Sequence, residues 1–138
     1  MIVQPDADMV THRLSDAGRV LFMLPDTGHG KTLRASSWEK LGLPERPTGL
    51  PMLRCVPLAR DVTLMDEAMG WLSLIPRDRQ VLRRIVAARC LVSPLTERHL
   101  FSWRRLGTLL GADHKAVIRW HALGIDLIVA ALRGRQAA

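Results

Sequence analysis

Apolar residues recur along much of the chain at alternating spacings of three and four, which is the pattern of helices that bury one side. The first helix is predicted over residues 7–24, because Pro25 ends it. Its apolar stripe consists of Val10, Leu14, Ala17, Leu21 and Leu24. We expect this stripe to pack against the rest of the chain, and a docking face or a dimer seam is the alternative.

Residues 25–60 interrupt the helical pattern, because they hold five of the eight prolines. Long regular elements are disfavoured in such a segment. The sequence from Ser36 to Glu39 has the arrangement of a capping box, so one short helix is predicted over 37–42. The rest of the segment is expected to be an extended connector.

A dense helical pattern follows, and Pro76 divides it into two helices. The first is predicted to begin at Thr63 as its N-cap, and the second to span 77–90. The apolar positions are Leu64, Ala68, Trp71, Leu72 and Ile75 in the first helix and Val81, Leu82, Ile85 and Val86 in the second. Residues 91–101, which include Pro94, are predicted to form a loop.

Two further helices complete the predicted chain. Ser102 is expected to cap a helix from Trp103 to Leu110, which Gly111 ends. Asp113 is expected to cap a last helix over about 114–132, which ends before Gly134.

This last pair has the spacing of a helix-turn-helix. Gly107 supplies a small residue where the helices cross, and Gly111 tolerates the positive φ of the turn. The buried positions expected to hold the crossing angle are Leu106, Leu110, Val117 and Trp120. The predicted fold is all-α: a multi-helix DNA-binding domain over 61–138 with a C-terminal helix-turn-helix, preceded over 1–60 by an N-terminal helix and a proline-rich arm that serves partner contact or packing.

The formal charge of +7 on 138 residues is unevenly distributed. Residues 1–76 carry 8 basic and 9 acidic side chains, whereas residues 77–138 carry 12 and 4. Seventeen of the twenty basic residues are Arg, which suits bidentate contacts to phosphate and guanine. A basic excess confined to one part of the chain indicates a polyanionic partner, and a solvated face without a partner is the alternative.

In a helix-turn-helix the second helix enters the major groove of double-stranded DNA with its N-terminal half facing the bases. The residues predicted to face bases are His114, Lys115, Ile118 and Arg119. The residues predicted to contact phosphates are Ser102, Arg104, Arg105 and Thr108. An ordinary helix pair without a DNA contact is the alternative. Aromatic residues make up only 4% of the chain, which leaves little for base-stacking platforms.

Four segments carry a resemblance to a known family: residues 66–72 (DEAMGWL), 75–82 (IPRDRQVL), 102–107 (SWRRLG) and 116–121 (AVIRWH). They resemble the fourth region of bacterial sigma factors, and also small phage-derived regulators of alphaproteobacteria, including gene-transfer-agent activators of the GafZ type. The link over 91–101 is longer than usual for that group. The resemblance implies transcription control, with RNA polymerase or a sigma factor as a second partner.

The chain is therefore expected to be a sequence-specific DNA-binding transcription regulator and not an enzyme, acting as an activator or antiterminator with RNA polymerase or a sigma factor. A homodimer or a second anchor would supply the specificity that one helix-turn-helix lacks. The alternative is a protein-only adaptor that binds polymerase or sigma without reading DNA. A third reading, a small phosphate-handling enzyme built on Lys31, is disfavoured, because Pro25 stands where a phosphate-binding loop needs Gly.

The cysteines and histidines add no separate chemistry. Cys55 and Cys90 lie far apart, and none of the five histidines has metal-ligand spacing, so neither a metal nor a cofactor is expected. The N-terminus lacks the features of a signal peptide, and no apolar run is long enough to span a membrane. The expected location is the cytoplasm, in association with the nucleoid.

Overall fold

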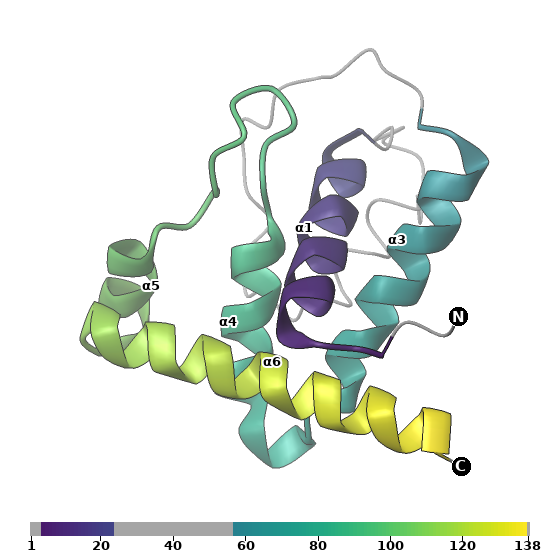
Figure 1. The fold of residues 1–138 in the computed structure, drawn as a ribbon. Helices are drawn as coiled ribbons and strands as arrows, with labels where there is room; N and C mark the ends of the chain where they lie inside the picture. The colour runs from purple at the N-terminus through teal and green to yellow at the C-terminus, as the bar shows by residue number, and fades with distance from the viewer. Residues whose placement is uncertain (1–3, 24–56, 138) are drawn as a thin grey trace.

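The computed structural model describes residues 4–23 and 57–137, most of which lie in helices (Figure 1). The α-helices are α1 (Ala7–Met23), α3 (Ala59–Trp71), α4 (Gln80–Cys90), α5 (Trp103–Leu110) and α6 (His114–Ala137). Two 3₁₀ turns, η1 (Leu72–Leu74) and η2 (Arg77–Arg79), connect α3 to α4. The predicted all-α class is confirmed for these residues. The connector and the short helix predicted over 37–42 lie outside them.

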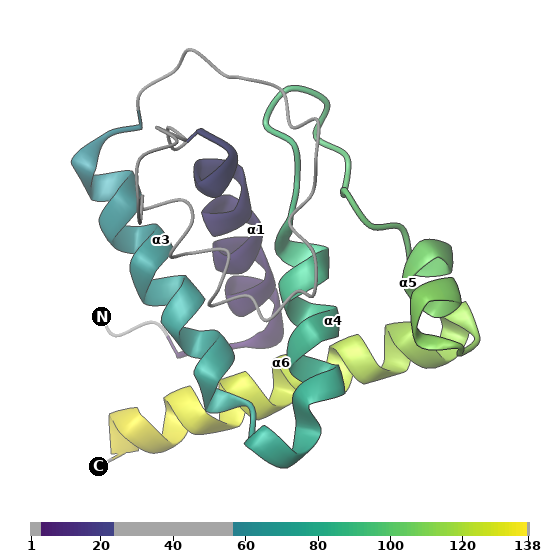
Figure 2. The same cartoon turned by 180° about the vertical axis from the view of Figure 1, so that it is seen from behind.

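Helix α1 lies between α3 and α4 in both views of the fold, and α6 runs across one end of this group (Figures 1 and 2). Accordingly, α1 contacts α3, α4 and α6. Helix α5 lies apart from α1 and α3 and packs against the N-terminal end of α6. The pair of α5 and the first turns of α6 thus projects from one side of the molecule.

The larger of two hydrophobic clusters, here called the main cluster, joins α1, α3, α4 and the C-terminal half of α6. The predicted stripe of α1 contributes Val10, Leu14, Ala17 and Leu21, all buried; Leu24 lies outside the described residues. Gly18 marks the closest approach, because a Cβ at this position would overlap the backbone carbonyl of Cys90. Helix α1 is therefore part of the same core as the C-terminal helices.

The smaller cluster, here called the α5 cluster, consists of Ile85 and Ala88 from α4, Leu106 from α5 and Val117 from α6. The predicted positions agree with this packing. Leu106 and Val117 are buried, while Leu110 and Trp120 are half-buried against them.

The start of α3 was predicted wrongly. The helix begins at Ala59, four residues before Thr63, which lies inside it and donates its hydroxyl to the Ala59 carbonyl over 3.0 Å. Leu58, in extended conformation, precedes the helix and forms no side-chain cap. Because the helix starts earlier, Leu64 turns outward and is 40% exposed, whereas Met65 takes the buried position.

Two smaller corrections concern α4 and α6. Residues 77–79 form the 3₁₀ turn η2 before α4 begins, and Val81 is 46% exposed. Helix α6 continues through Gly134 to Ala137, because one glycine costs a helix only about 1 kcal/mol and good helix formers surround it. Arg133 also anchors this end, since its Nε donates to the Pro5 carbonyl over 2.8 Å.

The link over 91–101 is a loop, as predicted, but it is well packed. An isolated antiparallel bridge joins Val92 to His99, and the Leu100 amide donates to the Leu91 carbonyl over 2.9 Å. Leu91 and Val92 are buried beside α1 and α4. At the tip, the Glu97 carboxylate pairs with Arg19 of α1 at 2.8 Å. This link thus forms a hairpin that is fastened to α1.

Candidate nucleic-acid interface

The candidate site is the α5–α6 unit, defined as residues 102–121. It begins at Ser102, whose extended backbone lets its Oγ accept a hydrogen bond from the Arg105 amide at 3.1 Å. This bond satisfies one of the free amides of the first helical turn, as the sequence predicts. The boundaries of α5 coincide with the predicted ones.

The turn between the helices depends on Gly111, which has a φ of 67° and a ψ of 34°. This left-handed conformation is readily adopted by glycine and costs other residues energy. The next amide, that of Ala112, returns to the Gly107 carbonyl over 2.8 Å. The Gly107 and Thr108 carbonyls at the end of α5 are therefore satisfied, and the chain reverses within three residues before α6 begins.

Gly107 allows the close crossing of the two helices. A Cβ at this position would lie 2.7 Å from the Ala112 carbonyl oxygen and 3.3 Å from the His114 amide nitrogen. Both neighbours are backbone atoms, which cannot rotate away. The small residue expected at the crossing is confirmed.

The four residues predicted to face bases lie on the first turns of α6, away from the α5 cluster. Lys115, Ile118 and Arg119 are exposed, and His114 is half-exposed. Lys115 and Arg119 are four residues apart and share one side of the helix. Neither forms an ion pair with any residue that the structure describes, whereas His114 Nδ1 lies 3.3 Å from an Asp113 carboxylate oxygen.

The four residues predicted to contact phosphates are exposed as well, but three of them already have an internal contact. Ser102 caps α5, Thr108 donates its hydroxyl to the Arg104 carbonyl over 3.1 Å, and the Arg105 guanidinium lies 5.0 Å from the centre of the Phe101 ring. The Arg104 side chain has no ion pair within residues 4–23 and 57–137. It is therefore the least constrained of the four.

A polar and aromatic cluster that the sequence did not predict holds α5 in place. The Arg89 guanidinium of α4 lies 3.8 Å from the centre of the Trp103 ring, and the His121 ring of α6 meets that indole edge-on at 5.2 Å. Arg89 Nη1 also donates to the Phe101 carbonyl over 3.0 Å, and His99 Nδ1 donates to the Arg89 carbonyl over 2.8 Å. One arginine thus links α4, the hairpin loop and α5.

This environment disfavours the charged form of both imidazoles. Burial lowers the pKa of His121 to about 4, and the nearby charge of Arg89 adds to the effect. Burial and the charge of Arg89 also lower the pKa of His99. His121 is thus a half-buried packing residue. No periodicity could have paired residues 89, 103 and 121, because they meet only in the tertiary fold.

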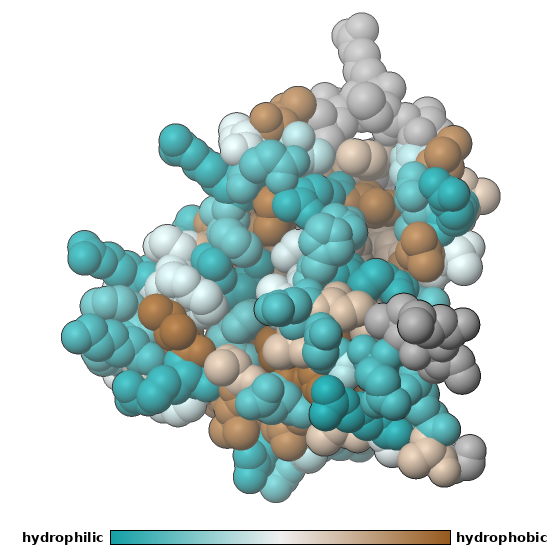
Figure 3. All heavy atoms as spheres, in the orientation of Figure 1, coloured by the Kyte–Doolittle hydropathy of each residue, from teal (hydrophilic) through white to brown (hydrophobic). Residues whose placement is uncertain are grey.

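Exposed apolar side chains interrupt the polar surface of the α5–α6 unit. Leu109 is 64% exposed, Leu123 just beyond the unit is 42% exposed, and Ile118 is 40% exposed. Figure 3 shows this end of the molecule as mainly hydrophilic, with hydrophobic spots among the projecting side chains. Leu109 was not singled out from the sequence. Its only signal is that it follows the polar positions 104, 105 and 108 on the outer side of α5.

No protein-family model, curated protein or solved structure matches the chain. In the described part of the chain, no helix is long and apolar enough to cross a membrane. Nor do residues 4–23 and 57–137 contain a group of three or more His, Cys, Asp or Glu side chains suited to a metal ion. Cys90 is buried, and its thiol donates to the Ala87 carbonyl over 2.9 Å. Cys55 and the glycines around Lys31 lie outside the described residues.

Proposed function

We propose that the chain is a DNA-binding transcription regulator that places the first turns of α6 in the major groove of double-stranded DNA. One observation carries the proposal: α5, a glycine turn and the projecting end of α6 form a tightly crossed pair. Three of its outer side chains, Arg104, Lys115 and Arg119, are exposed cations without an ion pair to any residue that the structure describes. A helix-turn-helix needs this crossing, and a groove-binding helix needs its N-terminal turns free of the protein core.

Within this proposal the exposed side chains have distinct roles. Arg119 and Lys115 face guanine edges, Ile118 faces a thymine methyl group, and His114 stands at the entry to the groove. Arg104, Arg105, Ser102 and Thr108 lie along phosphates, which fix the register without specifying sequence. The basic excess of the C-terminal part supplies the attraction that brings the protein to DNA at all.

A second candidate is a protein-only adaptor that binds RNA polymerase or a sigma factor. The specific observation in its favour is Leu109, a large apolar side chain that is 64% exposed on α5. Exposed apolar residues surrounded by polar ones are typical of protein contacts. The two candidates also combine, since an activator or antiterminator touches both DNA and polymerase.

The test is to incubate the full chain with a pool of random duplexes, recover the bound fraction and sequence it. We expect a preferred site, with binding that weakens as salt is added. If about six phosphates are neutralised, the slope of log affinity against log salt is about −5. An absence of duplex binding at low salt contradicts the DNA proposal and leaves the adaptor. The Leu109→Ser variant is the matched test of the adaptor candidate, because it removes the exposed apolar side chain of α5 and leaves the cations that would contact DNA intact.

A further inference from the structure

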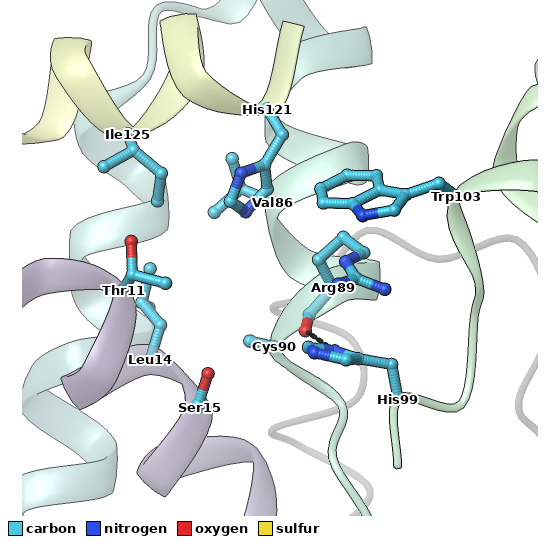
Figure 4. A pocket seen from close by; sticks show the side chains of 10 residues that line it. All are labelled: Thr11, Leu14, Ser15, Val86, Arg89, Cys90, His99, Trp103, His121 and Ile125. Carbon is cyan, nitrogen blue, oxygen red and sulfur yellow. Dashed lines mark hydrogen bonds between the residues drawn. The ribbon is translucent and has the colours of Figure 1, made fainter. Parts of the chain in front are cut away.

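A cavity of about 170 Å³ lies between α1, α4, the hairpin loop and the start of the α5–α6 unit (Figure 4). One wall is apolar and includes Leu14, Val86 and Ile125, and the Trp103 indole closes one end. The size is informative, because a cavity of about 150 Å³ is enough to hold benzene. The space therefore suits a molecule with a single ring and one small substituent.

Arg89 supplies a positive charge to the polar part of the cavity wall. His99 and His121 also line the cavity, and no carboxylate does. Two acidic side chains on the neighbouring elements, Asp16 and Glu97, are both engaged by Arg19, at 2.9 and 2.8 Å. Arg89 thus has no carboxylate partner among the described residues. A cation on the wall of a partly closed cavity favours an anionic ligand.

Unused hydrogen-bonding groups also line the cavity. The Nε of Arg89 is buried and has no hydrogen-bond partner among the described residues. Opposite it, the hydroxyls of Thr11 and Ser15 on α1 face the same space (Figure 4) and form no hydrogen bond within residues 4–23 and 57–137. The Arg89 guanidinium donates a single hydrogen bond to the described residues, to the Phe101 carbonyl, so it has donors left for an acceptor in this cavity.

We propose that the cavity binds a small aromatic carboxylate of the size of benzoate. Its ring packs between the apolar wall and the Trp103 indole, and its carboxylate accepts hydrogen bonds from the cationic wall and from the Ser15 hydroxyl. The binding itself does not depend on the function proposed above. Its consequence does: Trp103 belongs to α5 and His121 to α6, so the ligand biases the position of the α5–α6 unit and hence its affinity for DNA.

The experiment titrates benzoate into the full ¹⁵N-labelled chain and follows the backbone amides by NMR, with benzamide as an uncharged probe of the same shape. We expect saturable shifts confined to amides around the cavity, and benzoate binding about tenfold more tightly than benzamide, because hydrogen bonds to a charged acceptor are about twice as strong. Equal binding of both probes overturns the anionic preference. Shifts spread over all surface arginines, or no saturable binding, overturn the site.

Two variants of Ser15, on the α1 side of the cavity, are compared with each other, so that a general effect on folding does not decide the result. Ser15 is half-buried on α1, so Ser15→Asp places a negative charge at the cavity and Ser15→Asn is the neutral control of the same size. We expect Ser15→Asp to bind benzoate about tenfold or more weakly than Ser15→Asn, because the two side chains have the same size and differ in charge. Identical binding by the two variants contradicts the proposal. Because benzoate binding is measured without DNA, its failure and the failure of the DNA proposal are separate results.

Discussion

The two halves of α6 belong to different environments. From Gly124 onward the helix lies across α1, α3 and α4, and its residues Ile125, Ile128 and Val129 are part of the main cluster. From His114 to Leu123 only Val117 is buried, against the much smaller α5 cluster. One continuous helix thus connects a structural half to a half that presents its side chains to solvent.

This difference separates the part that stabilises the fold from the part that we propose contacts DNA. Most of the buried apolar area lies in the main cluster, so that cluster stabilises the fold. The α5 cluster needs only to hold a short helix at a fixed angle, which leaves the cations Arg104, Lys115 and Arg119 without ion pairs to the described residues. Substitutions in the two regions are therefore expected to differ both in size and in what they impair.

The largest effect is expected at Gly18, where α1 meets the end of α4. Gly18→Ala forces a Cβ onto the Cys90 carbonyl, so the two helices must separate. The free energy of unfolding should fall by more than about 3 kcal/mol, measured by urea denaturation. Gly134→Ala is the matched control, because a Cβ there meets nothing within 4 Å. It should stabilise by up to about 1 kcal/mol. Equal effects of the two substitutions would contradict the packing of α1.

The corresponding substitution in the other region is Gly107→Ala. Its Cβ would meet the Ala112 and His114 backbone, so the crossing of α5 and α6 must open. We expect a loss of about 2 kcal/mol of stability, less than at Gly18, because the main cluster stays intact. The variant should also lose more DNA affinity than its reduced folding stability alone would cause. A variant that binds DNA normally would show that the crossing angle is not needed.

Acid should weaken the α5 side of the molecule through His121. Its pKa is about 4 in the folded protein and about 6.5 when unfolded, so between these values unfolding takes up a proton and stability falls as the pH falls. From pH 7 to 4.5 the wild type should lose about 2 kcal/mol more than His121→Gln, measured by urea unfolding at both values. Equal losses of stability in the wild type and in His121→Gln would show that the acid sensitivity comes from residues other than His121.

The smallest effect is expected at the Ser102 cap. Ser102→Ala should cost about 1 kcal/mol of stability, whereas Ser102→Asp should retain the cap. The same Ser102→Asp variant should bind DNA more weakly, because it adds a negative charge where a phosphate is proposed to lie. Stability by thermal unfolding and affinity by gel shift separate the two roles. Unchanged DNA binding by Ser102→Asp would remove this residue from the phosphate contacts.

Local signals explain what could be predicted from the sequence. Ser102 caps α5 and Gly111 ends it through interactions within a few residues, so both were identified correctly. Thr63 and Gly134 were misassigned because local preference was overruled: α3 starts earlier without a side-chain cap, and α6 continues past its glycine. Tertiary packing decides such boundaries.

The residues that hold α5 in place at the candidate site could not be predicted in the same way. Arg89, Trp103 and His121 come from three separate elements, and no spacing along the chain links them. The cavity beside them is likewise a product of the tertiary fold, with α1 as one wall. The exposed cations of α6, by contrast, follow directly from helical periodicity once Val117 is assigned to the core.

The most direct test of the difference between the two halves of α6 compares two exposed arginines on this one helix, Arg119 in the projecting half and Arg135 at the far end. Affinity for the selected duplex is measured for Arg119→Ala and Arg135→Ala at one salt concentration. We expect Arg119→Ala to cost about 1–3 kcal/mol of binding free energy and to relax the preference at one base pair, while Arg135→Ala leaves both unchanged. Equal losses from the two substitutions, or no loss from Arg119→Ala, would contradict the assignment of the projecting half of α6 to the groove.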